Sequence, residues 1–295
     1  KKSHPVLFRG KAEAFAFIDA HRGSMSVERL CRLYRVTRSG YYAWRQRPES
    51  ARRGQDRALL EAMGRIFNGS GGTYGSPRLH RALAACGHRV SRRRVERLMR
   101  IGGLRARVVR IYRRKAGTHR WFGQHPNRVR GSRATAPDEV WVSDVTYLAV
   151  GRRWWYLAAV LDQYSRRVLA WRLASARSSH LTGGAVEAAL RRRRPKAGLI
   201  FHSDRGSEYL GVPLRQRLDA HGARQSMTRG GAPDENAHME SFFHSLKADV
   251  IHGRRFESVT DLRRALTRYV SYYNHKRLHS ALSYHSPVDY EQGAA

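Results

Sequence analysis

Three apolar, strand-forming segments lie between residues 140 and 173, and they constrain the fold more than any other part of the chain. The first is VWVSDVTYLAV, which ends at Val150, and the others are Trp154–Asp162 and Arg167–Leu173. Valine, tryptophan and tyrosine at this density are typical of β-strands. The connections are too short to hold a crossover helix, so neighbouring strands must run antiparallel.

After the third segment the pattern changes to alternating helices and short strands. An antiparallel meander followed by such alternation predicts a mixed, five-stranded α/β sheet. We expect this α/β domain to occupy residues 136–295. Helices are expected at 178–194, 213–221, 235–249 and 259–273, and short strands at 199–202 and 223–226.

Helices are the only regular elements predicted in the first 110 residues. Ser26 and Thr37 each precede a short helical pattern, and both residue types cap helix N-termini well. Two short helices with a tight turn are typical of a helix-turn-helix, although a plain helical hairpin without DNA contact has the same pattern. The predicted parts are a helix-turn-helix region at 1–50, a second helix-turn-helix domain at 51–110, a basic linker at 111–135 and the α/β domain at 136–295.

The second helical domain is the stronger DNA-binding candidate. Ser76 and Pro77 should begin one helix, with serine as its cap, and Ser91 should cap the next. Val95 and Leu98, together with Met99, are expected to form the buried stripe of this last helix. The arginines expected to face outward and contact DNA phosphates are Arg92, Arg93, Arg94, Arg97 and Arg100.

The net charge of +34 indicates a polyanionic partner. Residues 1–130 hold 32 Lys+Arg against 7 Asp+Glu, so most of the excess lies in the helical part and its linker. Codon bias toward arginine can contribute, but it does not explain why acidic residues are so few. Double-stranded DNA is therefore the expected partner.

The remaining composition excludes several classes of protein. Cys31 and Cys86 lack the spacing of a zinc site or a disulfide framework, and both are expected in apolar cores. No apolar run reaches the 18 residues of a membrane span, and no secretory signal is expected. Since the first residue is not Met, the sequence is compatible with a fragment or with part of a fused product.

Two aspartates and one glutamate are the candidate catalytic residues. Asp144 lies inside a strand, where aspartate is disfavoured and a buried carboxylate needs a partner. Asp204 follows a strand at its carboxyl end, where sites of α/β sheets lie. Glu240 shares one helix face with Asn236 and His244. Each has an ordinary alternative, as a turn aspartate or a solvated glutamate, so the prediction depends on the three together.

Three carboxylates in a basic protein favour metal-dependent chemistry on phosphates. Carboxylate oxygens suit Mg²⁺, and two ions about 3.5–4 Å apart can activate an attacking oxygen and stabilise a leaving one. We therefore expect Asp144, Asp204 and Glu240 to bind two Mg²⁺ ions, with Mn²⁺ able to substitute. His202 and Asn236 are expected to support these ligands.

Two further carboxylates compete for a role. Asp162 ends a strand near the first aspartate and either supports the site or pairs with Arg166 or Arg167. Glu208 follows the second aspartate by four residues and is expected to serve loop structure or to contact DNA.

Several segments make a family resemblance specific. DVTYLAVGRRWWYLAAVLDQYSRRVLAW, FHSDRGSEY, ENAHMESFFHSLK and YYNHKRLHSALSYHSPVDYE resemble the second-frame transposases of the insertion-sequence-three family, as do RSGYYAW and YGSPRLHRAL. The resemblance covers about residues 25–292. It implies a retroviral-integrase-like enzyme with an RNase H fold, in which Asp144, Asp204 and Glu240 bind the metal. It also implies that His244 and Lys247 contact DNA.

The resemblance further implies the activity and the partners. Expected are binding of terminal inverted repeats, cleavage at the element end and strand transfer, by a homodimer or larger assembly in the bacterial cytoplasm, associated with the nucleoid. An upstream-frame segment is an expected partner. Glu235 replaces the aspartate usual in the family, which affects the loop before Glu240. The alternatives are a catalytically silent DNA-binding regulator of the same fold and a nuclease that does not join ends.

Overall fold

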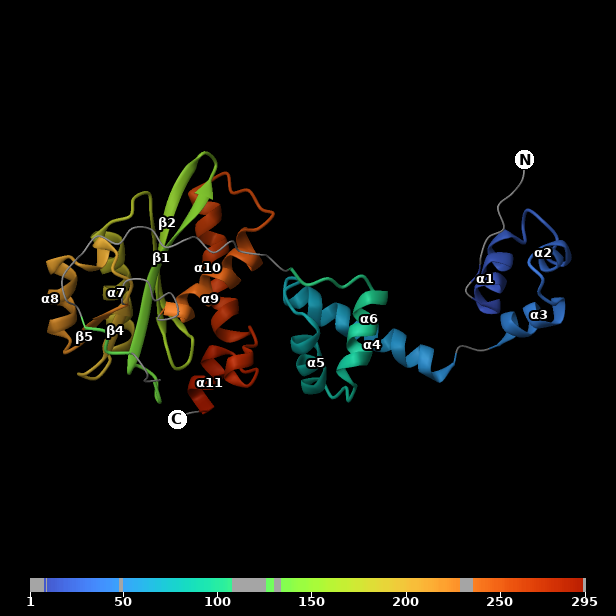
Figure 1. Ribbon diagram of the computed structural model, residues 1–295, viewed down its shortest axis with the longest axis horizontal. Helices are drawn as coiled ribbons and strands as arrows, with labels where there is room; N and C mark the ends of the chain where they lie inside the picture. Colours follow the sequence, from blue (N-terminus) through green and yellow to red (C-terminus); the bar gives the residue numbers. More distant parts are fainter. Residues whose placement is uncertain are drawn as a thin grey trace. The chain divides into compact units, whose positions relative to one another are not determined.

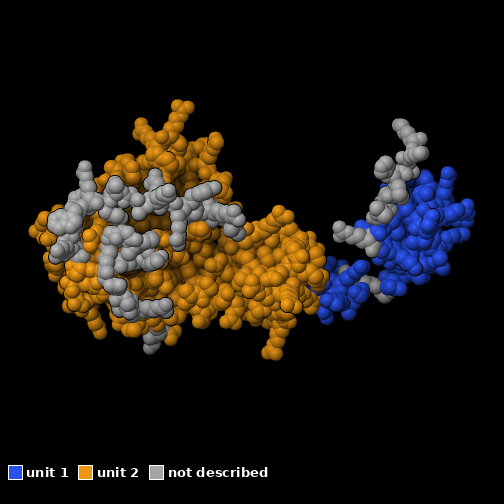
Figure 2. Space-filling model, in the orientation of Figure 1, with its two compact units in different colours: residues 1–61 blue, residues 62–295 orange. Residues whose placement is uncertain are grey.

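The computed structural model describes residues 8, 10–47, 50–107, 126–129, 134–228 and 236–293. The chain divides into two compact units, residues 1–61 and residues 62–295 (Figure 2). In the part that is described, no helix combines the length and apolar character needed to cross a membrane. Glu235 and most of the expected basic linker at 111–135 lie outside the described residues.

The first unit contains the predicted helix pair. Its helices are α1 (Lys11–His21), α2 (Val27–Leu33), α3 (Arg38–Gln46) and the first part of α4 (Ala51–Gly69). The expected caps are confirmed: Ser26 Oγ accepts the backbone N–H of Arg29, and Thr37 Oγ1 accepts that of Gly40. The small core of this unit consists of Phe15, Ile18, Leu30, Cys31 and Tyr41.

The second unit begins with the rest of α4, followed by α5 (Ser76–Ala85) and α6 (Arg92–Ile101). Ser91 caps α6, and its predicted apolar stripe is buried. At α5 the prediction was wrong in one detail, since Gly75 is the N-cap residue and Ser76 Oγ donates to Glu96 instead. Cys86 was also predicted wrongly: it follows the last turn of α5, off the buried face, and is exposed.

The predicted five-stranded mixed sheet is confirmed. Its strands lie in the order β3-β2-β1-β4-β5. β1, β2 and β3 form an antiparallel meander, whereas β4 runs parallel to β1, and β5 runs parallel to β4. The strands are β1 (Val140–Val150), β2 (Arg153–Asp162), β3 (Val168–Ala174), β4 (Ile200–Ser203) and β5 (Arg224–Met227).

Helices cover both faces of this sheet (Figure 1). α7 (Ser179–Arg193) and α8 (Val212–Ala220) pack on the face that carries Trp141. α9 (Ala237–Leu246) and α10 (Val259–His275) pack on the face that carries Val142 and Leu148. Because side chains alternate along a strand, Asp144 belongs to the α9 face.

The helix that carries Glu240 changes form after 10 residues. One helix was predicted over 235–249, but α9 ends at Leu246 and a π-helical turn occupies Lys247–Ile251. α10, a 3₁₀ turn at Ser280–Leu282 and α11 (Pro287–Gly293) complete the chain.

The second unit also contains contacts between its amino-terminal helices and the segment after α10. Tyr74 Oη donates to the carbonyl of Lys276 (3.0 Å) and accepts the N–H of Leu278 (3.2 Å). Arg78 Nε donates to the carbonyl of Leu278 (2.8 Å). All three bonds to this segment are made to main-chain atoms.

A buried ion pair lies next to this contact. Arg277 Nε is 3.2 Å from Asp249 Oδ2, and each side chain is only 7% exposed. Tyr269 Oη donates to the same oxygen (3.1 Å), and Arg277 Nη2 donates to Ser245 Oγ (3.1 Å). These bonds join α10 and the residues after it to the end of α9 and to the π-helical turn.

Candidate active site

Asp144 and Asp204 are neighbours at the edge where β1 and β4 stop pairing. The parallel register matches Ser143 with Ser203, and these are the last paired residues. Asp144 is the next residue of β1, and Asp204 directly follows the end of β4. Local backbone N–H groups hold both carboxylates, since Val145 donates to Asp144 Oδ1 (2.7 Å) and Gly206 to Asp204 Oδ1 (3.1 Å).

The two carboxylates repel each other electrostatically. Burial raises the pKa of Asp144 to about 7, and the negative charge of Asp204 adds to this rise. Burial also raises the pKa of Asp204, while the hydrogen bond from Gly206 opposes the rise. A site that holds two adjacent carboxylates at this cost is suited to a cation.

A guanidinium partly balances this negative charge. Arg177 Nη2 lies 3.9 Å from Asp204 Oδ2. The same side chain pairs closely with Glu208, whose carboxylate is buried. Arg177 Nε donates to that carboxylate at 2.7 Å. Glu208 thus holds Arg177 beside the aspartates, which agrees with the expectation that it serves loop structure.

A buried hydrogen-bond network joins the elements that carry the candidate residues. Ser143 Oγ donates to the carbonyl of Ala159 (2.9 Å) and shares a second bond with Tyr209 Oη (2.9 Å). Asn236 Nδ2 donates to the carbonyl of Ser143 (3.3 Å). Tyr209 lies five residues after Asp204, so the network connects both strand ends with the start of α9.

Glu240 lies one helical turn after Asn236, but it is exposed. Among the residues that the structure describes, no three His, Cys, Asp or Glu side chains form a cluster able to hold a metal ion. The structure therefore brings two members of the expected triad together and does not bring Glu240 to them. His244 is exposed on the same helix, and Lys247 Nζ lies 5.0 Å from the ring centre of Tyr147.

The structure does not bring two of the expected supporting residues to the aspartate pair. His202 is fully buried and its Nδ1 shares a hydrogen bond with Ser226 Oγ across β4 and β5 (2.9 Å). Asp162 lies opposite Trp141 and accepts hydrogen bonds from Ser165 and from the backbone of Asp138. Its oxygens thus bond the connection between β2 and β3 and the backbone just before β1.

The donors at the aspartate pair fit a divalent cation. Both side chains offer hard carboxylate oxygens whose charges repel each other, and a bound cation relieves this repulsion. Asn236 Oδ1, at the start of α9, is buried and has no hydrogen-bond partner among the described residues. It adds an amide oxygen, another ligand type that magnesium accepts in proteins.

The predicted DNA-contacting arginines of α6 differ in exposure. Arg92, Arg93 and Arg100 are exposed, and Arg92 also pairs with Glu96 (2.9 Å). Arg94 and Arg97 are half-buried, so they do not face outward as fully as predicted.

Comparisons with known proteins agree with this architecture. Two models described as integrase core domains match residues 134–233 and 221–287, and a model described as an HTH-like domain matches 54–114. The transposase InsF for insertion sequence IS3A of Escherichia coli K12 is 34% identical over 285 residues, covering 94% of this chain and 98% of that protein. The chain belongs to the IS3-family transposases.

A second relative of this transposase is the 31 kDa protein of insertion element IS600 from Shigella sonnei. It is 36% identical over 265 residues, covering 89% of this chain and 97% of the relative. Among solved structures, the catalytic core of HTLV-2 integrase in complex with magnesium is 17% identical, with a TM-score of 0.40. It covers 54% of this chain and 99% of that one. The matches to the integrase core models and to the InsF transposase make the protein a polynucleotidyl transferase with an integrase-like core.

Sequence reasoning missed Arg177, Ser143 and Tyr209. Tyr209 stands in the FHSDRGSEY segment, so its nearness to Asp204 along the chain was a usable signal. Ser143 precedes Asp144 and gives a similar signal. Arg177 lies between β3 and α7, and nothing in its local sequence indicates that it reaches Asp204.

Proposed function

We propose that this transposase binds the terminal inverted repeats of its element, cleaves the DNA at the element end and transfers the freed strand. Water attacks the phosphodiester at the end, and the strand leaves with a 3′-hydroxyl. That hydroxyl then attacks a second phosphodiester and displaces its 3′-oxygen. No covalent protein–DNA intermediate forms in either step.

The observation that carries the proposal is the pairing of Asp144 with Asp204 where β1 and β4 separate. β4 ends there while β1 continues to Val150, so the carboxylates lie at the carboxyl end of β4, where sites of α/β sheets lie. Asn236 supports the assignment of Glu240, because it fixes the start of α9 to the residue before Asp144. We assign the metal-binding and catalytic roles to Asp144, Asp204 and Glu240.

Mg²⁺ ions, two per site with Mn²⁺ able to replace them, would supply activation of the attacking oxygen and stabilisation of the leaving one. Asp144 and Asp204 would hold the ions, and Glu240 would join them once DNA or metal is bound. Arg177 keeps a positive charge beside Asp204 in their absence.

The basic residues are proposed to position the DNA. Arg92, Arg93 and Arg100 of α6 are exposed and suited to phosphate contacts, with Arg94 and Arg97 at the edge of the same surface. His244 and Lys247 lie one and two turns beyond Glu240, where a DNA end at the carboxylates would pass. Its DNA substrates would place the protein at the nucleoid in the bacterial cytoplasm.

A strand-joining assay tests the proposal. Purified protein is mixed with a labelled inverted-repeat end, a supercoiled target and Mg²⁺ or Mn²⁺, beside the Glu240→Gln variant. Joined product from the wild type alone supports both the activity and the assignment of Glu240. Cleavage without joining supports a nuclease instead.

Binding without chemistry in either protein would support the silent regulator, unless adding the upstream-frame segment restores joining. That addition is therefore a required arm of the assay. Cross-linking during the reaction tests the homodimer or larger assembly, because each joining event involves two ends.

A further inference from the structure

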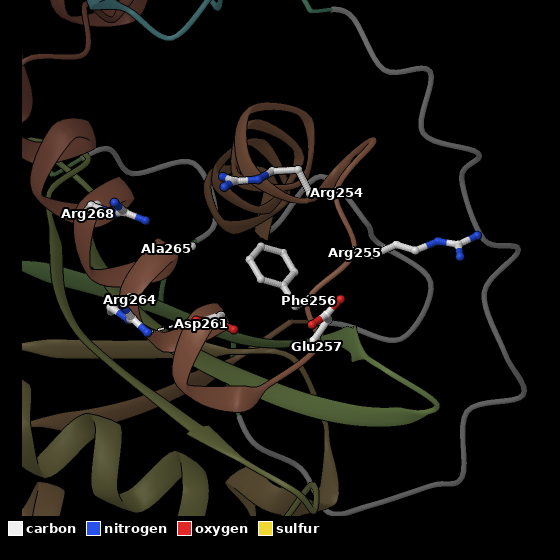
Figure 3. Close-up of a pocket in the computed structure, with 8 residues that line it drawn as sticks. All are labelled: Arg254, Arg255, Phe256, Glu257, Asp261, Arg264, Ala265 and Arg268. Carbon is white, nitrogen blue, oxygen red and sulfur yellow. Dashed lines mark hydrogen bonds and ion pairs between the residues drawn. The ribbon is translucent and has the colours of Figure 1, made fainter.

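A pocket of about 290 Å³ lies at the beginning of α10, away from the aspartate pair (Figure 3). We call it the α10 pocket, and its relevant residues are Arg254, Phe256, Asp261, Arg264 and Arg268. In Figure 3 the side chains of Arg254, Arg264 and Arg268 lie on one side of Phe256, whereas Arg255 points away. Three guanidinium groups therefore surround one concave surface.

One of the two carboxylates that line the pocket, Asp261, already has partners. Asp261 accepts a hydrogen bond from Ser258 Oγ (2.8 Å) and pairs with Arg264 (3.0 Å). Arg254 lies over the ring of Phe256, 5.7 Å from its centre. Arg268 forms no ion pair with a carboxylate among the described residues. Glu257 also lines the pocket, so four arginines and two carboxylates give its lining an excess of two positive charges.

The floor of the pocket is anchored to the sheet. Phe256 is 7% exposed and packs in the core between the sheet and α10. Its carbonyl accepts the N–H of Gly151, in the turn between β1 and β2, at 2.9 Å. The next two residues, Arg152 and Arg153, are exposed. The pocket and this turn therefore form one basic surface.

This surface is connected to the candidate active site by β1. Asp144 and Val150 are six residues apart on one strand, which corresponds to about 20 Å. Lys247 lies against Tyr147, between the two ends of this path. Cationic side chains thus accompany the hairpin from Asp144 to its turn.

We propose that the α10 pocket binds a backbone phosphate of duplex DNA about six base pairs from the phosphate that reacts. The spacing follows from the 20 Å path and a rise of about 3.4 Å per base pair. Guanidinium groups suit phosphate oxygens because they donate in a planar fork. The inference rests on the proposed function, since it takes the reacting phosphate to lie at Asp144 and Asp204.

The test compares two double variants in binding to the inverted-repeat duplex. Arg254→Ala/Arg268→Ala removes the pocket charges, and Arg192→Ala/Arg263→Ala removes two charges from another surface, beside β3. The slope of log K against log salt should fall in magnitude by about 2 in the pocket variant. It should change less in the control. Arg254→Lys/Arg268→Lys should recover most of the slope.

A second measurement locates the contact. Single neutral methylphosphonates are placed four to eight base pairs from the end, and binding of wild type and pocket variant is compared. A neutral group near position six should weaken wild-type binding about tenfold and leave the pocket variant unaffected. Equal sensitivity of the two proteins at every position, or an unchanged salt slope, would overturn the inference.

Both measurements are made in the Glu240→Gln background, with circular dichroism melts to show that every variant is folded. If the wild type neither cleaves nor joins DNA, the proposed function is wrong, but the binding measurements still test the α10 pocket. Failure of the wild type to bind duplex DNA would overturn both.

Discussion

Burial raises the pKa of Asp144, and Asp204 raises it further because both carboxylates directly follow the last paired residues of two parallel strands. The folded protein therefore binds a proton at Asp144 more tightly than the unfolded chain does. The two carboxylates are close only when the sheet is formed, so they repel each other in the folded protein and not in the unfolded chain.

The first prediction is that Asp144→Asn stabilises the metal-free protein at high pH. The pKa of Asp144 is about 7 in the folded protein and 3.8 ordinarily, so wild-type stability falls as pH rises from about 4 through 7. The variant should melt a few degrees higher than wild type at pH 8, and by less at pH 5. Differential scanning fluorimetry measures this. Mg²⁺ should raise the wild-type midpoint at pH 8 but not that of the variant, and an equal shift in both would contradict the assignment.

The second prediction concerns the buried bond between Ser143 and Tyr209. Tyr209→Phe removes a hydroxyl contact and should cost about 1 kcal/mol in the free energy of unfolding. Because the lost bond holds the two strand ends together, the joining rate should fall about tenfold. The control is Tyr290→Phe, which removes the hydroxyl that bonds Tyr164 at another end of the fold. If the two variants join DNA at equal rates, the proposal that Tyr209 positions the strand ends is wrong.

The third prediction is a strong loss of stability in Asp249→Asn. The change leaves Arg277 charged and buried without its carboxylate, which should cost about 3 kcal/mol. Guanidinium chloride unfolding measures the loss. Asp261→Asn breaks an exposed pair with Arg264 and should cost about 0.5 kcal/mol. If both variants lose a similar free energy of unfolding, the burial of Arg277 is not the reason for the large cost of Asp249→Asn.

The fourth prediction concerns acid. Burial, with the positive charges of Arg277 and Arg78 nearby, lowers the pKa of His279 to about 3 from its ordinary 6.5. The unfolded chain therefore binds more protons between these values, and stability falls as pH drops below 6.5. The loss attributable to His279 should reach about 2 kcal/mol at pH 5. His279→Phe keeps a ring against Tyr273 and should flatten this part of the curve. The control is His252→Phe, at an exposed histidine. Its unfolding free energy should depend on pH as in the wild type, and a flattened pH dependence in this control would mean that His279 is not the group responsible.

Much of the fold could be predicted because its signals are local. The strands of the meander, the caps Ser26 and Thr37 and the buried face of α6 depend on residues close in sequence. Asp144 and Asp204 also gave local signals, since one is an aspartate inside a strand and the other directly follows a strand at its carboxyl end.

The remaining features depend on contacts between distant residues. Arg177 meets Glu208 across 31 positions, and Asp162 turns toward Ser165 because the β2–β3 connection offers it N–H donors. The helical pattern around Glu240 predicts which face of the helix carries it, but it does not predict how far that face lies from the sheet. The α9 pattern likewise does not distinguish an α-helical continuation from the π-helical turn at Lys247–Ile251.

The contact of Tyr74 and Arg78 with Lys276 and Leu278 uses main-chain atoms only on the side of the later segment. Such a contact recognises the path of the chain and is indifferent to its side chains. Residues 276 and 278 can therefore change in composition without loosening it, whereas proline at 278 would remove the donated N–H. Two neighbouring contacts, Thr73 with Tyr272 and Arg81 with Tyr284, do depend on side chains, so an exchange of helical domain and core within the family requires those pairs to be retained together with the tyrosine and the arginine.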